Sequence, residues 1–416
     1  MLSRRWLGES FAPACPQMKI VIAHNSYILH GGEDVVAEQE ANLLREHGNA
    51  VVEYRRSNRE IEKKSMGGLS LLLQTIWASD SRKDFRELLR RERPDLVHFH
   101  NTFMMISPSA YYACTEYGVP VVQTVHNYRL LCLSGDLFRG GKICEECIGR
   151  TIPWPGVRHR CYHGSLSHSA AVASMLLAHR ALRTWERKVD LFIAPSAFLA
   201  EKLAQGGIPA EKIVVKPNFV AFDTSVRAGR DDRYAIYLGR LSPEKGVRNL
   251  IAAWQKIEDL RLLIVGAGPE EDYIRATIME RGSGNVEMTG PQTRDSVAVL
   301  LKGAAFLVFP SQWHEPFGLA AVEAFASGVP VIAARAGAIS EIVRDGHTGL
   351  LFAPGSVDEL ARKVRWAIDN PEATRRMGEN ARRVYEQRYT PEKNYPMLME
   401  IYHRATARSS EFSATV

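Results

Sequence analysis

The sequence lacks an uninterrupted apolar stretch long enough to cross a membrane, because every candidate run in its 416 residues is broken by polar or charged side chains. A membrane-spanning helix needs roughly 20 consecutive apolar residues, so none is expected. Residues 1–17 also lack the apolar segment of a secretory signal, and we expect them to form a disordered leader before a first strand that opens at Met18. These absences together predict a cytoplasmic protein.

A strong excess of one charge is missing as well, since 53 Lys and Arg face 47 Asp and Glu. The excess falls in residues 1–220, which hold 28 basic and 22 acidic side chains, and mostly between residues 55 and 93. No nucleic-acid-binding motif accompanies this charge, so no nucleic-acid partner is expected. Two interpretations of residues 55–93 stay open: a solvated helical surface, or a surface that contacts anionic lipid at the inner face of the plasma membrane.

Cysteine is scarce, with six in the chain, yet four of them form one pattern. The spacing C-x11-C-x2-C-x13-C lies in a segment at about 127–164 and comprises Cys132, Cys144, Cys147 and Cys161. A paired C-x2-C with two outlying cysteines is typical of a tetrahedral structural zinc site. Two disulfides or four free thiols are the alternatives, and a cytoplasmic location disfavours the disulfides. We expect such a zinc site to lie away from any reacting group.

Short apolar runs alternate with amphipathic helical stretches from Met18 onward, which predicts parallel sheets covered by helices on both faces. The first series fits strands at 19–23, 50–54, 96–100, 119–125, 191–194 and 213–216. The second fits strands at 234–238, 262–265, 286–288, 305–309, 329–333 and 350–352. Between them, the charged segment 223–233 reads as a linker. The pattern predicts an α/β protein with two doubly wound domains, at 18–221 and 222–390, and a helical tail at 391–416.

The stretch from Ala305 to Ile332 is the best candidate for chemistry, because it combines a strand, a polar loop, a helix and a second strand. Glu315 stands in the loop, and Glu323 lies about two turns into a helix expected to begin near Phe317. Glu323 is surrounded by apolar neighbours, where an unpaired carboxylate is costly unless a partner or ligand satisfies it. The first backbone N–H groups of the helix, at Phe317, Gly318 and Leu319, are suited to bind phosphate.

The run E-P-F-G-L-A-A-V-E-A-F-A-S-G-V-P-V-I closely resembles the Glu-x7-Glu signature of the retaining glycosyltransferases of family four. The resemblance extends over nearly all of the chain from Met18 onward. It implies the GT-B fold, in which two Rossmann-like domains face each other across a cleft. The N-terminal domain would then bind the acceptor and the C-terminal domain the nucleotide sugar, with the last helix crossing back onto the first domain.

Further candidates for donor binding follow predicted strands, at the edge where open parallel sheets bind ligands. Gly31 and Gly32 follow the first strand, Arg240 and Lys245 stand in G-R-L-S-P-E-K-G-V after the strand at 234–238, and Gly266 and Gly268 form the next strand-to-helix turn. By resemblance, Arg240, Lys245 and the helix at Phe317 bind the diphosphate, Glu323 the ribose and Glu315 the sugar. Taken alone, Arg240 and Lys245 also fit two surface cations beside a turn.

His126 follows the predicted strand 119–125, and the family commonly places a histidine followed by aspartate near the reacting sugar carbon. Here Asn127 replaces the aspartate. The resemblance therefore assigns catalysis to His126, Glu315, Arg240 and Lys245. No Asp-x-Asp triplet occurs in the chain, so a metal-independent reaction without a catalytic cofactor is expected.

The expected partners are a nucleotide-diphosphate sugar and a glycan or lipid-linked acceptor, as in surface polysaccharide or glycolipid synthesis. Two alternatives stay open. One is a nucleotide-sugar epimerase on the same fold, and the other is a non-catalytic binding protein stabilised by zinc.

Overall fold

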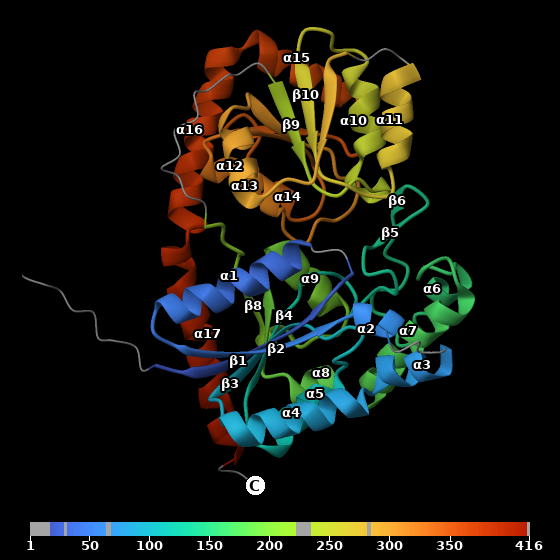
Figure 1. Ribbon diagram of the computed structural model, residues 1–416, viewed down its shortest axis with the longest axis vertical. Helices are drawn as coiled ribbons and strands as arrows, with labels where there is room; N and C mark the ends of the chain where they lie inside the picture. Colours follow the sequence, from blue (N-terminus) through green and yellow to red (C-terminus); the bar gives the residue numbers. More distant parts are fainter. Residues whose placement is uncertain (1–16, 29–30, 64–67, 222–233, 281–283, 414–416) are drawn as a thin grey trace, which may run out of the picture.

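The computed structural model describes residues 17–28, 31–63, 68–221, 234–280 and 284–413. Two α/β units are stacked one above the other, and the last two helices run along one side of both (Figure 1). Most of the predicted leader, residues 1–16, and the predicted linker at 223–233 lie outside the described residues.

The N-terminal unit contains a six-stranded parallel sheet with the order β2-β1-β3-β4-β7-β8. Its strands are β1 (Lys19–Ser26), β2 (Ala50–Ser57), β3 (Leu96–Asn101), β4 (Val121–Thr124), β7 (Leu191–Ala194) and β8 (Ile213–Val215). Its main helices are α1 (Gly32–Glu46), α3 (Gly68–Ile76), α4 (Ser79–Glu92), α5 (Ser109–Glu116), α7 (Leu166–Ala181) and α9 (Ala197–Gln205), with the short α2 (Arg59–Lys63) and α8 (Thr184–Lys188) between them.

The C-terminal unit repeats this plan with the order β11-β10-β9-β12-β13-β14. Its strands are β9 (Tyr234–Leu238), β10 (Arg261–Val265), β11 (Val286–Gly290), β12 (Phe306–Phe309), β13 (Val331–Ala334) and β14 (Gly349–Phe352). Its helices are α10 (Val247–Trp254), α11 (Glu271–Glu280), α12 (Arg294–Lys302), α13 (Leu319–Ala326), α14 (Ile339–Ile342) and α15 (Val357–Asp369). Near-continuous apolar strands such as Phe306–Phe309 are fully buried, as expected of a parallel sheet covered on both faces.

The predicted fold class is confirmed, and every predicted strand exists with ends that shift by at most a few residues. One boundary matters for the site. The helix expected near Phe317 begins at Leu319, with Gly318 as its N-cap. Gly318 has a φ of 133°, which side chains other than hydrogen rarely allow, and a Cβ there would lie 3.0 Å from Ile339 Cδ1. The loop therefore extends two residues further than the periodicity indicates.

The final helices α16 (Pro371–Arg388) and α17 (Pro391–Ser413) cross from the C-terminal unit to the N-terminal one (Figure 1). Leu398, Met399 and Tyr402 of α17 are buried in one cluster with Ile20 and Ile22 of β1. The crossing helix thus covers one face of the N-terminal sheet, as the family resemblance implied.

A buried ion pair joins α1, the end of β8 and α17. Lys216 Nζ lies 2.7 Å from Glu40 Oε1 and 2.8 Å from Asn394 Oδ1. Lys216, Glu40 and Asn394 are each 0% exposed. A buried charge is tolerated only when it is paired and hydrogen-bonded, so these three side chains depend on one another.

The segment between β4 and α7 carries the four cysteines of the C-x11-C-x2-C-x13-C pattern. It forms the two-stranded antiparallel hairpin β5 (Phe138–Arg139) and β6 (Lys142–Ile143), followed by the short helix α6 (Trp154–Arg158). The hairpin reaches up toward the C-terminal unit (Figure 1). We call residues 127–164 the insertion.

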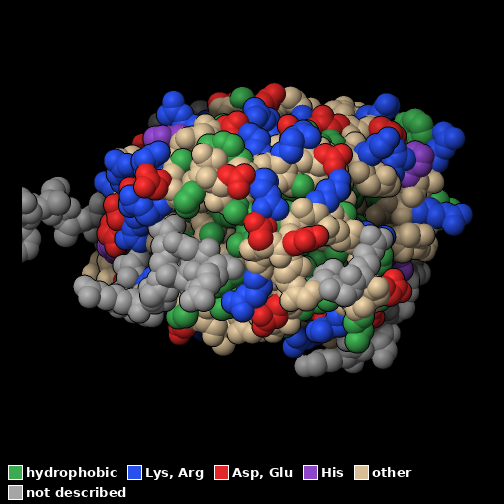
Figure 2. All heavy atoms as spheres, turned by 90° about the horizontal axis from the view of Figure 1, so that it is seen from above, with side chains coloured by type: hydrophobic (Ala, Val, Ile, Leu, Met, Phe, Trp, Pro, Cys, Tyr) green, Lys and Arg blue, Asp and Glu red, His purple; other side chains and the backbone are tan. Residues whose placement is uncertain are grey.

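Among the described residues, no helix has both the length and the apolar character needed to cross a membrane. Viewed from above the C-terminal unit, basic and acidic side chains are interspersed over the surface (Figure 2). In the basic stretch 55–93, several arginines are paired with acidic neighbours: Arg55 with Glu53, Arg56 with Glu60 and Asp80, Arg82 and Arg86 with Glu116, and Arg91 with Glu92. Part of the basic charge of this stretch is therefore paired within the protein.

Removing one member of the Lys216–Glu40 pair should be far more harmful than removing both. We expect Lys216→Met to lower the free energy of unfolding by about 3–5 kcal/mol, because it leaves the Glu40 carboxylate buried and unpaired. The double variant Lys216→Met, Glu40→Leu should recover most of this loss. Urea denaturation of the parent and of both variants measures it, and a double variant no more stable than the single one would contradict the pairing.

Candidate active site

Glu315 is fixed by three donors that converge on one oxygen. Its Oε1 accepts from Lys245 Nζ at 2.5 Å, from Ser311 Oγ at 2.7 Å and from Trp313 Nε1 at 2.8 Å. The Glu315 backbone also pairs with Gly337, and its carbonyl accepts from the Ala338 N–H at 2.9 Å. With Oε1 fully engaged, Oε2 is the oxygen left to accept from a ligand hydroxyl. The structure thus brings together Glu315 and Lys245, two of the predicted catalytic residues.

Arg240 stands beside this pair but is exposed, and its side chain makes no hydrogen bond within the described part of the chain. Opposite it lies Asp136 of the insertion. Burial raises the pKa of Asp136 to about 6, while the charges of Arg129, Arg240 and Lys245 partly oppose that increase. Sequence reasoning missed Asp136, because nothing in its local pattern indicates that the insertion reaches the cations of the other domain.

The start of α13 faces the start of α1 across the cleft. Within the described residues, the N–H groups of Phe317, Gly318 and Leu319 have no hydrogen-bond acceptor, as is normal for a helix N-terminus. A Cβ placed on Gly32 would lie 3.0 Å from Leu319 Cδ1, so the two predicted donor-binding segments are in contact. Gly31 is the N-cap of α1 in an extended conformation, with a φ of −137°.

Gly266 and Gly268 have a packing role that their sequence context did not reveal. A Cβ on Gly266 would lie 1.9 Å from the Gly239 carbonyl oxygen, and one on Gly268 would lie 2.3 Å from that of Leu241. Both glycines therefore let the turn after β10 approach the backbone that carries Arg240. Glycine here shapes the cationic loop, whether or not it also contacts a nucleotide.

Glu323 is half-buried on α13, and its surroundings disfavour its charge. Burial raises its pKa from 4.5 to about 7, and the nearby Arg294 only partly offsets the effect. The apolar surroundings expected for Glu323 from the sequence therefore do disfavour its ionised form. Arg294 belongs to α12, so this part of the site is built from two neighbouring helices of the C-terminal unit.

His126 follows β4 and stacks on His100, with ring centroids 5.2 Å apart. Its Nε2 lies 3.0 Å from His100 Nδ1. Burial lowers the pKa of His126 to about 3, so the ring is neutral near pH 7. His126 also lines a small pocket of the N-terminal unit together with Asn127 and Arg129.

Glu33 is a second residue that sequence reasoning left without a role in ligand binding. Its carboxylate accepts from Asn101 Nδ2 at 2.8 Å and from Asn127 Nδ2 at 3.3 Å. Burial, followed by the charge of Asp34, raises its pKa to about 8. Glu33 thus brings a carboxyl group next to Asn127 from the first turn of α1. Its position directly after Gly31 and Gly32 was the available signal.

The insertion contacts the loop that carries Glu315. Glu145, between Cys144 and Cys147, lies 3.1 Å from His314 Nε2 and 2.8 Å from Lys202 Nζ. Close by, Ser196 Oγ donates to the Pro316 carbonyl at 2.7 Å. Glu341 accepts from the backbone N–H of Phe198 at 2.6 Å, at the start of α9. The insertion therefore contacts the loop that carries Glu315 through Glu145. The expected position of a zinc site away from any reacting group stays a prediction.

All four cysteines of the insertion are free thiols. Burial raises the pKa of Cys161 to about 11, and the other three thiols contribute to its environment. No three of the four sulfur atoms lie within 4.8 Å of one another, although all four cysteines belong to the described residues. Four sulfurs around one zinc ion would be ~3.8 Å apart, so binding would draw them closer together.

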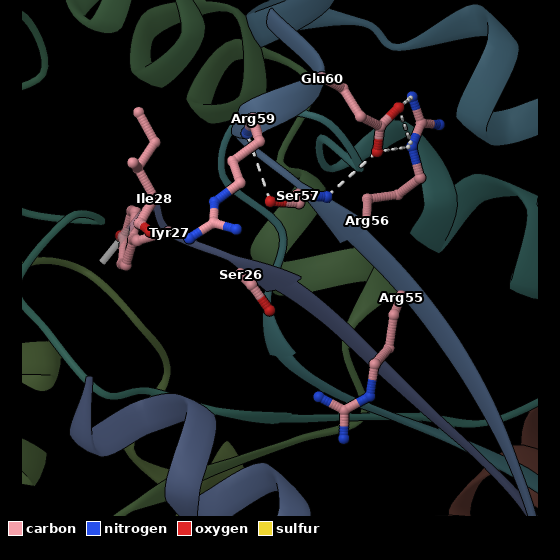
Figure 3. Close-up of a pocket in the computed structure, with 8 residues that line it drawn as sticks. All are labelled: Ser26, Tyr27, Ile28, Arg55, Arg56, Ser57, Arg59 and Glu60. Atoms are coloured by element: carbon pink, nitrogen blue, oxygen red, sulfur yellow. Dashed lines mark hydrogen bonds and ion pairs between the residues drawn. The ribbon is translucent and has the colours of Figure 1, made fainter. Parts of the chain in front are cut away.

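An open pocket lies at the carboxyl ends of β1 and β2 (Figure 3). Arg55 and Arg59 lie on its wall, while Arg56 is held by Glu60. Arg59 also donates to the Ile28 carbonyl at 3.1 Å. Arg55 is paired with Glu53 and Glu38, so the Arg59 guanidinium beside the Ser26 and Ser57 hydroxyls is the better suited of the two to an anionic group. This pocket belongs to the N-terminal unit, on the predicted acceptor side.

Two facing Rossmann-like units, with cations and two glutamates at the carboxyl edge of the second sheet, define the GT-B class. The structure is similar to Anabaena HepE solved in complex with UDP and glucose, with a TM-score of 0.64 and 21% identity over 96% of this chain and 100% of that one. At this identity the likeness shows the fold.

Family comparisons identify both units. Residues 31–224 match the family described as Glycosyltransferase Family 4, and residues 222–384 match Glycosyl transferases group 1. The chain therefore carries these two glycosyltransferase domains, in this order.

Curated relatives agree with this assignment. The chain is 30% identical to glycogen synthase of Mycobacterium tuberculosis over 304 residues, which are 70% of this chain and 64% of that protein. It is 26% identical to alpha-D-kanosaminyltransferase of Streptomyces kanamyceticus over 336 residues, which are 76% of this chain and 79% of that protein. The chain spans 48% and 64% of the length of the first two curated relatives it matches.

The raised pKa of Glu323 predicts a pH-dependent cost to folding. The pKa of the Glu323 carboxyl is 4.5 in the unfolded chain and about 7 in the folded protein. The folded protein therefore favours the neutral carboxyl, and the stability that this gives is lost as pH rises through 7. As pH rises from 5 to 8, the free energy of unfolding of Glu323→Gln should increase relative to that of the parent by roughly 1–3 kcal/mol. Unfolding midpoints across this range measure it. The exposed control Glu379→Gln should follow the parent, and a parallel Glu323→Gln curve would contradict the assignment.

Proposed function

We propose that this protein is a retaining, metal-independent glycosyltransferase that moves a sugar from a nucleoside-diphosphate sugar to a glycan or lipid-linked acceptor. The observation that carries the proposal is the Lys245–Glu315 pair, which stands beside Arg240 and the free N–H groups of α13. The cations are suited to the diphosphate of a nucleotide sugar, and the carboxylate is suited to the hydroxyls of its sugar. Retention of anomeric configuration rests on the resemblance of the Glu-x7-Glu stretch.

In this proposal Lys245 keeps its bond to Glu315 and uses its remaining N–H groups on the diphosphate, together with Arg240 and the N–H groups at Phe317, Gly318 and Leu319. These donors stabilise the charge that grows on the leaving nucleoside diphosphate. They supply positive charge without a divalent ion. Glu315 then offers Oε2 to a sugar hydroxyl.

Glu323 would accept from the ribose hydroxyls, with Gly266 and Gly268 bordering the nucleotide and Gly31 and Gly32 closing over the diphosphate. Glu33 and the pocket at Arg55 and Arg59 lie on the acceptor side. An acceptor with hydroxyls and a phosphate group, as in a lipid-linked glycan, suits both. We accordingly place the reaction in surface polysaccharide or glycolipid synthesis, in the cytoplasm or at the inner membrane face.

The experiment that tests this function is a screen of UDP-, GDP-, ADP- and dTDP-sugars for protection against melting and for release of nucleoside diphosphate. With the donor so found, Lys245→Ala should lower turnover by roughly 10- to 100-fold, since a charge-assisted bond that strengthens in the transition state is lost. Lys256→Ala, in the same domain but paired with the exposed Asp358, is the matched control.

Parental turnover in Lys245→Ala would contradict the placement of the diphosphate. Formation of an epimer from the donor alone would favour the epimerase alternative instead. Binding of a sugar nucleotide without turnover, whatever acceptor is supplied, would favour the non-catalytic alternative. Proton NMR of the first glycoside product reports whether the anomeric configuration is retained.

We also propose that Cys132, Cys144, Cys147 and Cys161 bind one structural zinc ion. All four side chains are free thiols within the insertion, and Gly149, two residues after Cys147, has a φ of 71° that turns the chain back. Burial raises the pKa of Cys147 and Cys161, a cost that a bound cation relieves by stabilising their thiolates.

Metal analysis of protein purified without added zinc should find about one zinc per chain. The double variant Cys144→Ser, Cys147→Ser should lose the metal and melt at a lower temperature. Cys114→Ser, which changes a buried cysteine outside the insertion, should keep the metal. A metal-free parent protein with an oxidised Cys144–Cys147 pair would contradict the proposal.

A further inference from the structure

A line of buried polar side chains leads from the crossing helix to His126. Lys216 Nζ binds Glu40 Oε1 at 2.7 Å, Glu40 Oε2 faces His100 Nε2 at 3.4 Å, and His100 Nδ1 faces His126 Nε2 at 3.0 Å. Glu40 and Lys216 are 0% exposed and His100 is 2% exposed. Glu40, Lys216 and His100 are therefore shielded from solvent.

The carboxylate decides where His100 carries its proton. Glu40 Oε2 and His100 Nε2 are both buried, lie 3.4 Å apart and have no hydrogen-bond partner of their own within the described residues. Burial lowers the pKa of His100 well below its usual value, so the ring is neutral and has one N–H and one lone pair. An N–H facing the carboxylate is attracted to it, whereas a lone pair there would be repelled in a low-dielectric interior. His100 therefore carries its proton on Nε2.

The same reasoning fixes His126. With its proton on Nε2, His100 has a bare Nδ1, and the 3.0 Å contact requires His126 to donate from its own Nε2. His126 then has a bare Nδ1. This atom has no hydrogen-bond partner within the described residues, and the half-buried His126 lines a pocket of the N-terminal unit.

We propose that Glu40, acting through His100, fixes His126 in the tautomer whose bare Nδ1 accepts a hydrogen bond from a hydroxyl of the donor sugar. The contact with the donor sugar rests on the proposed function, whereas the tautomer of His126 does not. Glu40 and His100 are positioning residues, held in turn by Lys216 and by Asn394 of α17. The crossing helix thereby contributes to the active site without reaching it.

A metal ion is the competing interpretation of this cluster, because ligand atoms of Glu40, His98 and His100 lie within 4.8 Å of one another. Lys216 already supplies positive charge to Glu40. Both ring nitrogens of His98 are engaged, Nδ1 with the Tyr402 hydroxyl at 2.8 Å and Nε2 with the Thr124 hydroxyl at 2.7 Å. A metal would have to displace these bonds, so we favour the proton arrangement.

Long-range proton–nitrogen NMR of the full chain labelled with 15N-histidine tests the tautomer. His100→Asn and His126→Asn assign the two rings, and the parent protein gives the answer. We expect both rings to be neutral with the proton on Nε2 from pH 6 to pH 8. A proton on Nδ1 of His126, a charged ring, or a metal bound at His100 would overturn the inference.

Glu40→Gln tests whether Glu40 sets the two tautomers. An amide can donate as well as accept, so it no longer requires His100 to carry its proton on Nε2. We expect a large share of His126 to shift to the Nδ1-protonated tautomer in this variant. The control Glu38→Gln, an exposed residue of the same helix, should leave both rings unchanged. Glu40→Asp should keep the parental tautomer because it keeps a carboxylate. An unchanged His126 in a folded Glu40→Gln protein would overturn the role of Glu40.

With the donor identified, kcat separates this role from a merely structural one. We expect Glu40→Gln to lower kcat about tenfold while the affinity for the nucleoside diphosphate stays within about twofold of the parent, and Glu40→Asp to restore part of kcat. An altered tautomer with parental kcat would overturn the contact to the sugar. If the parent transfers no sugar, the proposed function fails, while the NMR result still decides the tautomer.

Discussion

The buried Lys216–Glu40 pair is the interaction on which the N-terminal half of the cleft depends. It joins the last strand of the first sheet to α1, and Asn394 joins both to the helix that returns from the second domain. Three segments far apart in the sequence thus satisfy two charges that none could bury alone. The same contact orients His100 and through it His126. The Lys216–Glu40 pair therefore both stabilises the N-terminal domain and orients His126.

The C-terminal half of the cleft depends on a second convergence. Glu315 is held by Lys245, Ser311 and Trp313, and the loop that carries it is held from outside by Glu145 of the insertion, through His314, and by Ser196, through Pro316. The loop that carries Glu315 is therefore held by contacts from the N-terminal unit as well as from its own unit. Glu315 belongs to the C-terminal domain, but residues of both domains hold its loop in place.

The N-terminal unit holds acidic and basic groups side by side near His126. Glu33 and Asp136 bring carboxyl groups to a wall that also holds Arg129, and burial raises the pKa of both acids. Groups of this kind are suited to hydroxyls, which can donate to either oxygen. The guanidinium pocket at Arg55 and Arg59 adds a place for an anion nearby.

The sequence by itself determined the two sheets, their order along the chain and the Glu315–Glu323 stretch, because apolar periodicity and turn residues are local properties. It placed Arg240, Lys245 and His126 at strand ends for the same reason. Only the tertiary structure decided that Lys245 binds Glu315, that Gly266 and Gly268 serve packing, that Glu33 accepts a hydrogen bond from Asn127, and that the insertion reaches the loop of Glu315. These contacts join residues tens to hundreds of positions apart. Their geometry depends on how the two domains and the crossing helix pack, which no local pattern contains.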